Sequence, residues 1–178
     1  MLFRSRFYTG CGWGFLLHAI GMSWLAQEEV QGKYIYGVYV LLSLLIALQF
    51  GVFSYFFTLK RLKNYLGLFV FAGFWVLLEW SRSFFFTGYM WNQVGLYLTF
   101  NTYSAQTLSL VGVFGLSYLV VFTNLLLARF LLLENRHLEN LSLILLLICV
   151  PYLYGFIRVS SLDKQFQGAE KLKALLVQ

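Results

Sequence analysis

Charged residues are scarce in this chain. They make up only 11% of it, whereas hydrophobic residues make up 60%, and an ordinary soluble domain carries roughly a quarter charged residues. This balance excludes a typical soluble domain and indicates that lipid is the main solvent of the chain. The net charge of +6 is spread over several short segments and forms no concentrated basic face, so the sequence predicts no nucleic-acid partner.

Cysteine and the common catalytic motifs are also largely missing. Cys11 and Cys149 lie in different apolar segments, without CxxC spacing or clustered histidines, so they predict neither a disulfide framework nor a metal site. The sequence has no Ser-His-Asp set, no HExxH and no phosphate-binding glycine loop. The residues alone therefore predict a membrane domain with no catalytic residue, no metal and no cofactor.

Long uncharged runs are abundant instead. A bilayer core is about 30 Å thick, which takes about 20 apolar residues in a helix. The runs predict an all-α, polytopic membrane helix bundle over residues 1–157, followed by a polar tail over 158–178. About five transmembrane helices are expected, near residues 8–27, 34–59, 65–86, 105–133 and 141–157. The first is predicted to be a retained span, because it lacks the compact leucine-rich core and small-residue cleavage site of a secretory signal.

Lysine and arginine alternate between the ends of these helices. Seven lie on the side of the N-terminus and two, Lys33 and Arg82, in the opposite short loops. Positively charged loops stay in the cytoplasm, so the sequence predicts a multi-pass membrane protein with its N-terminus in the cytoplasm. Five spans place the C-terminus on the outer side of the membrane. The seven are Arg4, Arg6, Lys60, Arg61, Lys63, Arg129 and Arg136.

The stretch "EWSRSFFFTGYMWNQVG", residues 79–95, interrupts this apolar pattern. Glu79 and Arg82 are three residues apart, so on a helix they share a face and can pair. Ionisable groups in a membrane segment favour a bundle interior or a wet cavity, which points to a site facing lipid headgroups or another domain. In the alternative interpretation, Arg82 extends to the membrane surface and the nearby aromatic residues only anchor the helix there.

No charge occurs between Arg82 and Arg129. The part of this interval that follows Gly88 is rich in Trp, Tyr, Asn and Gln, and an external loop would normally collect charges. Such a segment is better suited to lying in the membrane interface or to re-entering the membrane where protein covers its backbone. We therefore expect a half-buried interfacial or re-entrant connection.

At this point the order of motifs resembles a known family. The block "FWVLLEWSRSFFFTGYMWNQVG", followed by "LVGVFGLSYLVVFTNLLLA", is similar to the membrane portion of bacterial apolipoprotein N-acyltransferase. Five residues fall at family spacing, although Tyr89-Met90 replaces the Phe-Pro of the family and relaxes the turn that proline would set. The matching residues, which we predict to form a substrate-binding or platform surface, are Glu79, Arg82, Gly88, Trp91 and Gly95.

The resemblance implies a protein of the bacterial inner membrane, with its C-terminus in the periplasm, and a truncated chain. The family has eight membrane helices and a periplasmic nitrilase-like catalytic domain before the last, and the five helices here resemble the third to the seventh. "EKLKALLVQ" at residues 170–178 then resembles the first strand of that domain, so 158–178 is expected to be an extracytoplasmic linker plus this strand.

Family chemistry transfers an acyl chain from a membrane phospholipid to the N-terminal diacylglyceryl-cysteine of an apolipoprotein, using a Cys nucleophile, a Glu base and an oxyanion-stabilising Lys. The resemblance places all three in the missing domain, so this chain alone is expected to be inactive. It would be a fragment, a truncated frame or one half of a split enzyme that needs a separate catalytic domain. The alternatives are a stand-alone lipid-binding or scaffold protein and a small transporter.

Overall fold

The computed structural model describes residues 2–84, 88, 90–133 and 138–167, and within these ranges the regular structure is helical. Five long helices are joined by short helical turns, which confirms the expected all-α, polytopic bundle. The long helices are α1 (Leu2–Gly21), α3 (Tyr34–Phe56), α5 (Tyr65–Ser81), α7 (Leu108–Leu132) and α8 (Leu138–Gln167). The short ones are η1 (Ser23–Leu25), α2 (Glu28–Gln31), α4 (Leu59–Leu62), η2 (Arg82–Phe84), η3 (Val94–Phe100) and α6 (Thr102–Ala105).

Four of the long helices are long and apolar enough to cross a membrane. Helix α1 does not reach this hydropathy in the described part of the chain, although it covers much of the predicted first span. Its 20 residues include Arg4, Arg6, His18 and four glycines, which lower its mean hydropathy. The four candidate spans are Tyr34–Phe56, Tyr65–Phe84, Leu108–Leu132 and Glu139–Phe166.

The last helix extends beyond the predicted boundary at residue 157. Helix α8 continues to Gln167, so residues 158–167 belong to a helix rather than to an irregular polar tail. No glycine or proline occurs between residues 156 and 167 to end it, and polar residues are compatible with a helix in water. The predicted strand at 170–178 lies outside the described residues, as do positions 85 and 86 of the predicted third helix.

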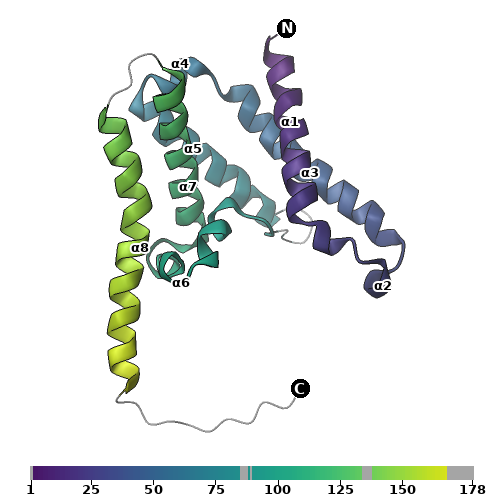
Figure 1. Ribbon diagram of the computed structural model, residues 1–178. Coiled ribbons are helices and arrows are strands. Elements are labelled where there is room, and N and C mark those ends of the chain that lie inside the picture. Colours follow the sequence, from purple (N-terminus) through teal and green to yellow (C-terminus); the bar gives the residue numbers. More distant parts are fainter. Residues whose placement is uncertain (1, 85–87, 89, 134–137, 168–178) are drawn as a thin grey trace.

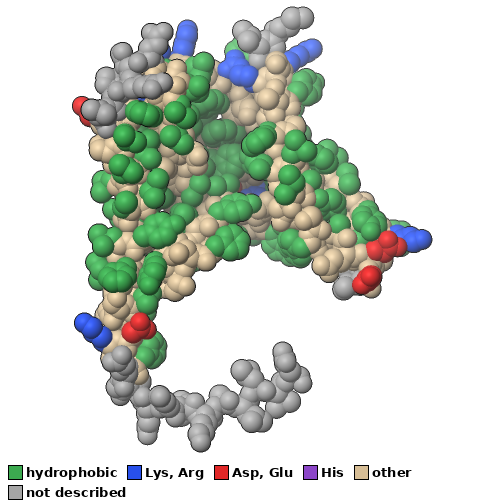
Figure 2. All heavy atoms as spheres, viewed as in Figure 1, with side chains coloured by type: hydrophobic (Ala, Val, Ile, Leu, Met, Phe, Trp, Pro, Cys, Tyr) green, Lys and Arg blue, Asp and Glu red, His purple; other side chains and the backbone are tan. Residues whose placement is uncertain are grey.

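The helices alternate in direction (Figure 1). The N-terminus, α4, the end of α7 and the start of α8 lie at one end of the molecule, whereas η3, α6 and the end of α8 lie at the other. Figure 2 shows Lys and Arg side chains at the end that carries α4, others at the right-hand tip and at the lower end of the molecule, and hydrophobic side chains over the sides of the helices. Many large apolar residues are exposed along the spans, among them Leu44, Leu66 and Leu153, as expected for surfaces in contact with lipid.

Helices α1 and α3 pack closely because small residues line their contact. A Cβ atom added to Gly10 would lie 2.7 Å from the carbonyl oxygen of Phe50, and one added to Gly14 would lie 2.7 Å from the Phe50 ring. From the other helix, a Cβ on Gly51 would lie 2.8 Å from the ring of Phe7. Glycine at these positions lets two backbones approach, the usual basis of helix association in lipid.

A second packing centre joins α4, α5, α7 and α8. Its buried residues include Leu62, Phe71 and Leu126. Arg129 is also buried there, and its Nη1 donates a 2.5 Å hydrogen bond to the carbonyl of Leu62 while its guanidinium lies 4.4 Å from the centre of the Tyr65 ring. Arg129 therefore fastens α4 to α7, a structural role in addition to its place in the basic end.

Candidate functional site at the end of α5

Glu79 and Arg82 form the ion pair that their spacing predicts. Arg82 Nη2 lies 3.8 Å from Glu79 Oε1 at the end of α5. The Glu79 side chain is completely buried, and Arg82 is only partly exposed. A carboxylate with no contact to water needs donors around it, so the surroundings of Glu79 decide what this pair does.

Two further donors share the same carboxylate oxygen. Trp75 Nε1, one helical turn earlier in α5, donates to Glu79 Oε1 at 2.9 Å, and the backbone N–H of Val94 donates to it at 2.9 Å. Val94 begins η3, so Glu79 connects the end of α5 to the segment that follows residue 88. The other oxygen, Oε2, is buried without a hydrogen-bond partner among the described residues.

Arg82 contacts the same segment at a second point. Its Nη1 donates to the carbonyl oxygen of Trp91 at 3.2 Å. The guanidinium therefore bridges Glu79 on the helix and Trp91 in the connection. Because Arg presents several donors in one rigid plane, it can hold two acceptors at once, which a lysine ammonium does less well.

The two glycines of the predicted site have backbone roles. Gly88 has φ of +87°, a conformation that glycine adopts without steric penalty. Gly95 packs directly on α7: its N–H donates to Ser117 Oγ at 2.9 Å, and an added Cβ would lie 2.5 Å from the carbonyl oxygen of Val113. Gly88 thus allows the turn after α5, and Gly95 allows close packing of η3 on α7.

Trp91 is half-exposed, at 48%. Its ring centre lies 5.4 Å from that of Trp24, just after α1. Both tryptophans line an open pocket of about 510 Å³ together with Asn92, Tyr97 and Phe100. The buried Glu79 network therefore holds an aromatic surface at the end of the bundle opposite α4.

A polar contact beneath this surface was not predicted from sequence. Asn92 Nδ2 lies 3.2 Å from Nδ1 of the buried His18, and the Tyr97 hydroxyl donates to Asn92 Oδ1 at 3.0 Å. Asn92 also has φ of +56°, in a region where asparagine is enriched. His18 alone suggests only a packing residue, and the signal that sequence reasoning passed over is the Asn directly after Trp91.

The predicted connection is half-buried, as expected. Gln93, Gly95 and Ser104 are buried, whereas Tyr97 and Phe100 are exposed. The Asn101 side chain caps α6 by accepting from the N–H groups of Tyr103 and Ser104, which is a usual role of asparagine at a helix start. The segment is therefore packed against the bundle rather than free.

The described residues show no arrangement for covalent catalysis. Cys11 lies against Gly51 in the α1–α3 contact and Cys149 is exposed on α8, and no hydrogen bond joins either thiol to a base among the described residues. No group of three or more His, Cys, Asp or Glu side chains that could hold a metal occurs in this part of the chain. What the geometry offers is a rigid aromatic and polar surface.

Comparison with known proteins agrees with this description. The profile of the apolipoprotein N-acyltransferase N-terminal domain matches residues 2–126. The chain belongs to the apolipoprotein N-acyltransferase family. Proteins named apolipoprotein N-acyltransferase are similar to it, with 30% identity over 148 residues in Rickettsia bellii and 34% over 137 residues in Coxiella burnetii. A third, from Chlamydia pneumoniae, is 30% identical over 178 residues.

These alignments cover 81%, 77% and 98% of the chain but only 28%, 27% and 32% of the three relatives. The chain therefore spans about a third or less of the length of these apolipoprotein N-acyltransferases. Glu79, Arg82 and Trp91 lie within the residues that the family profile matches. No solved structure matches the chain.

Proposed function

We propose that this chain is the membrane portion of an apolipoprotein N-acyltransferase. In the complete protein it would support transfer of an acyl chain from a membrane phospholipid to the N-terminal diacylglyceryl-cysteine of an apolipoprotein, a step of lipoprotein maturation. Family membership and the four apolar helices support this. The described residues include no set of catalytic side chains. We therefore assign the acyl transfer to a nitrilase-like domain and expect the chain alone to be inactive.

The role that we assign to the site is supported by one observation: Glu79 Oε1 accepts hydrogen bonds from both α5 and η3. With the Arg82 bridge to Trp91, it fixes the aromatic surface of Trp91 and Trp24 on the bundle. We assign this surface as a platform on which the catalytic domain rests and beside which lipid substrates are positioned. Tryptophan suits such a place because its ring is apolar and its N–H is polar.

The location that we propose is the bacterial inner membrane, with the platform on the periplasmic side. The distribution of positive charge supports it, because the basic residues near α4 lie at the other end of the molecule (Figures 1 and 2). Cytoplasmic ends of membrane proteins carry the excess of Lys and Arg. The N-terminus is then cytoplasmic and the end of α8 periplasmic.

The test is made in a full-length relative, at the position that aligns with Arg82. Arg82→Ala removes the bridge between Glu79 and the Trp91 carbonyl, and we expect kcat/KM to fall by tenfold or more, mainly through a raised KM for the lipid substrate. Arg82→Lys is the matched variant, because it keeps the charge but holds two acceptors poorly. It should show an intermediate loss.

Folding is followed in parallel by thermal unfolding in detergent. If Arg82→Ala leaves both activity and lipid KM unchanged, the platform role is wrong. An equal loss of kcat and of thermal stability in Arg82→Ala and Arg82→Lys, with KM unchanged, would assign Arg82 to folding only and would also contradict the proposal.

A further inference from the structure

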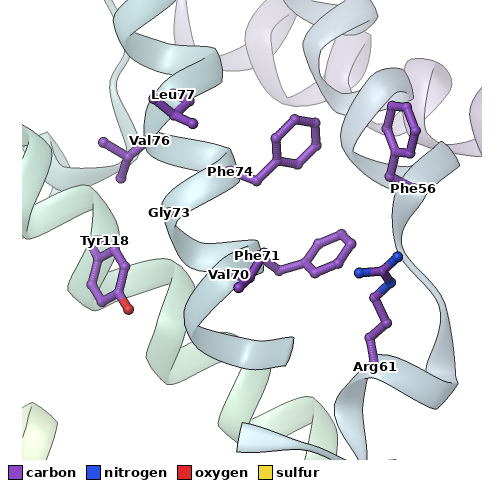
Figure 3. A pocket seen from close by; sticks show the side chains of 9 residues that line it. All are labelled: Phe56, Arg61, Val70, Phe71, Gly73, Phe74, Val76, Leu77 and Tyr118. Atoms are coloured by element: carbon purple, nitrogen blue, oxygen red, sulfur yellow. The ribbon is translucent and has the colours of Figure 1, made fainter. Parts of the chain in front are cut away.

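A second, larger groove lies along the middle of α5. It has a volume of about 600 Å³, within the range of small-molecule sites. Figure 3 shows its walls: Phe71, Phe74 and Leu77 along α5, Phe56 from the end of α3, and Tyr118 from α7. It follows α5 over eight residues, from Val70 to Leu77, a rise of about 10 Å at 1.5 Å per residue.

Gly73 leaves the middle of this groove open. A Cβ atom added there would meet no atom within 4 Å, so the space beside it is not filled by neighbouring side chains. The surrounding walls are apolar, and Phe56 and Phe74 meet edge to face at 5.8 Å. The interior therefore fits a flexible hydrocarbon.

The mouth of the groove is basic. The Arg61 guanidinium lies 5.3 Å from the centre of the Phe71 ring and points into the opening in Figure 3. Lys60 and Lys63 flank it and are exposed. Within the described ranges no carboxylate lies at ion-pairing distance from Arg61, so the mouth presents positive charge that no described residue neutralises.

We propose that this groove binds one acyl chain of an anionic phospholipid, with the lipid phosphate beside Arg61. The charge decides the occupant, because a guanidinium recognises phosphate oxygens with paired hydrogen bonds and the neighbouring lysines add attraction to an anionic headgroup. A transmembrane helix would fill the apolar groove but would leave the basic mouth without a partner. The site differs from the proposed platform, since α4 and η3 lie at opposite ends of the molecule (Figure 1).

The experiment measures lipid retained by the purified chain. The protein is titrated in detergent with phosphatidylglycerol or with phosphatidylcholine of the same acyl chains, and bound lipid is counted by native mass spectrometry. We expect one phosphatidylglycerol to bind about fivefold or more tightly than phosphatidylcholine, the effect of roughly 1 kcal/mol for one Arg at a membrane surface. Rising salt should reduce this preference.

Two variants separate the headgroup from the acyl chain. Arg61→Gln should remove most of the preference for phosphatidylglycerol and leave phosphatidylcholine binding unchanged. Gly73→Leu should fill the groove and weaken both lipids, and its helix should remain intact because no atom stands within 4 Å of the new Cβ. The matched controls are Lys33→Gln and Gly37→Leu near the start of α3, where an added Cβ also meets nothing within 4 Å; both should bind as the wild type does.

Several results would overturn the proposal. Equal binding of the two lipids that Arg61→Gln does not change would show that the mouth selects no headgroup. Wild-type binding by Gly73→Leu would place the lipid elsewhere. A dimer that Gly73→Leu, but not Gly37→Leu, converts to a monomer would assign the groove to a second copy of the chain.

Discussion

The buried carboxylate of Glu79 accepts a hydrogen bond from the backbone N–H of Val94, fifteen residues further along the chain, at 2.9 Å. The contact joins the end of a membrane helix to the start of a polar connection. Every substitution of residue 94 except proline keeps this backbone donor, so side-chain substitutions test the contact mainly at residue 79.

Removal of the Glu79 carboxylate should destabilise the bundle. In Glu79→Ala, Trp75 Nε1 and Val94 N–H both lose their acceptor, at about 1–3 kcal/mol for each donor left unsatisfied. Glu79→Gln keeps an oxygen for these donors, so it should destabilise less than Glu79→Ala, although it leaves the largely buried Arg82 without its opposite charge. Unfolding by SDS titration in mixed micelles, followed by circular dichroism, measures both. Equal stability of Glu79→Ala and the wild type would show that the shared oxygen does not hold η3.

The ion pair of Glu79 and Arg82 and the half-buried connection after Gly88 could be predicted from sequence, because both depend on residues close together in the chain. The family spacing could be predicted too, because it is a property of the sequence itself. The roles of Val94 and Ser117 could not, since their donors and acceptors meet only when η3 packs on α5 and α7. The extension of α8 to Gln167 was missed for a different reason. Hydropathy marks where a helix leaves the lipid, not where it ends, and Arg158, Asp163 and Lys164 continue it into water.

Gly95→Ala should separate η3 from α7. The new Cβ would lie 2.5 Å from the Val113 carbonyl oxygen and 2.6 Å from the Ser117 nitrogen, and both are backbone atoms that cannot rotate away. Overpacking of this kind destabilises by about 1–3 kcal/mol, measurable in the same SDS titration.

Gly73→Ala is the matched control for Gly95→Ala. It adds the same methyl group where no atom lies within 4 Å, and alanine in a helix interior is favoured over glycine by about 0.5–1 kcal/mol. The two substitutions should therefore change stability in opposite directions. If both destabilise equally, the close approach at Gly95 is not the cause.

Gly51→Cys should form a disulfide with the native Cys11. A Cβ atom on residue 51 would lie directly against Cys11 Sγ, and a disulfide requires close Cβ atoms on facing helices. After mild oxidation in detergent, a maleimide label should add once, to the exposed Cys149, instead of three times. Gly37→Cys, where a Cβ meets nothing within 4 Å, should keep three reactive thiols. Three labels on oxidised Gly51→Cys would contradict the packing of α1 on α3.

Asn92 combines a strained backbone with two side-chain contacts, and substitutions can separate these contributions. Its φ of +56° suits glycine and asparagine but not a β-branched residue. Asn92→Gly should lose only the contacts to His18 and Tyr97, at about 0.5–1.5 kcal/mol for each hydrogen bond. Asn92→Val should lose the same contacts and add a conformational penalty of about 1–3 kcal/mol.

The free energy of unfolding should therefore decrease from the wild type to Asn92→Gly and again to Asn92→Val. His18→Ala serves as the control for the contact to α1, because it removes one partner of Asn92 and leaves the backbone of residue 92 unchanged. In a double-mutant cycle, His18→Ala and Asn92→Gly should be coupled. Additive effects would show that the 3.2 Å contact between Asn92 and His18 contributes nothing, and equal stability of Asn92→Val and Asn92→Gly would rule out the strained backbone.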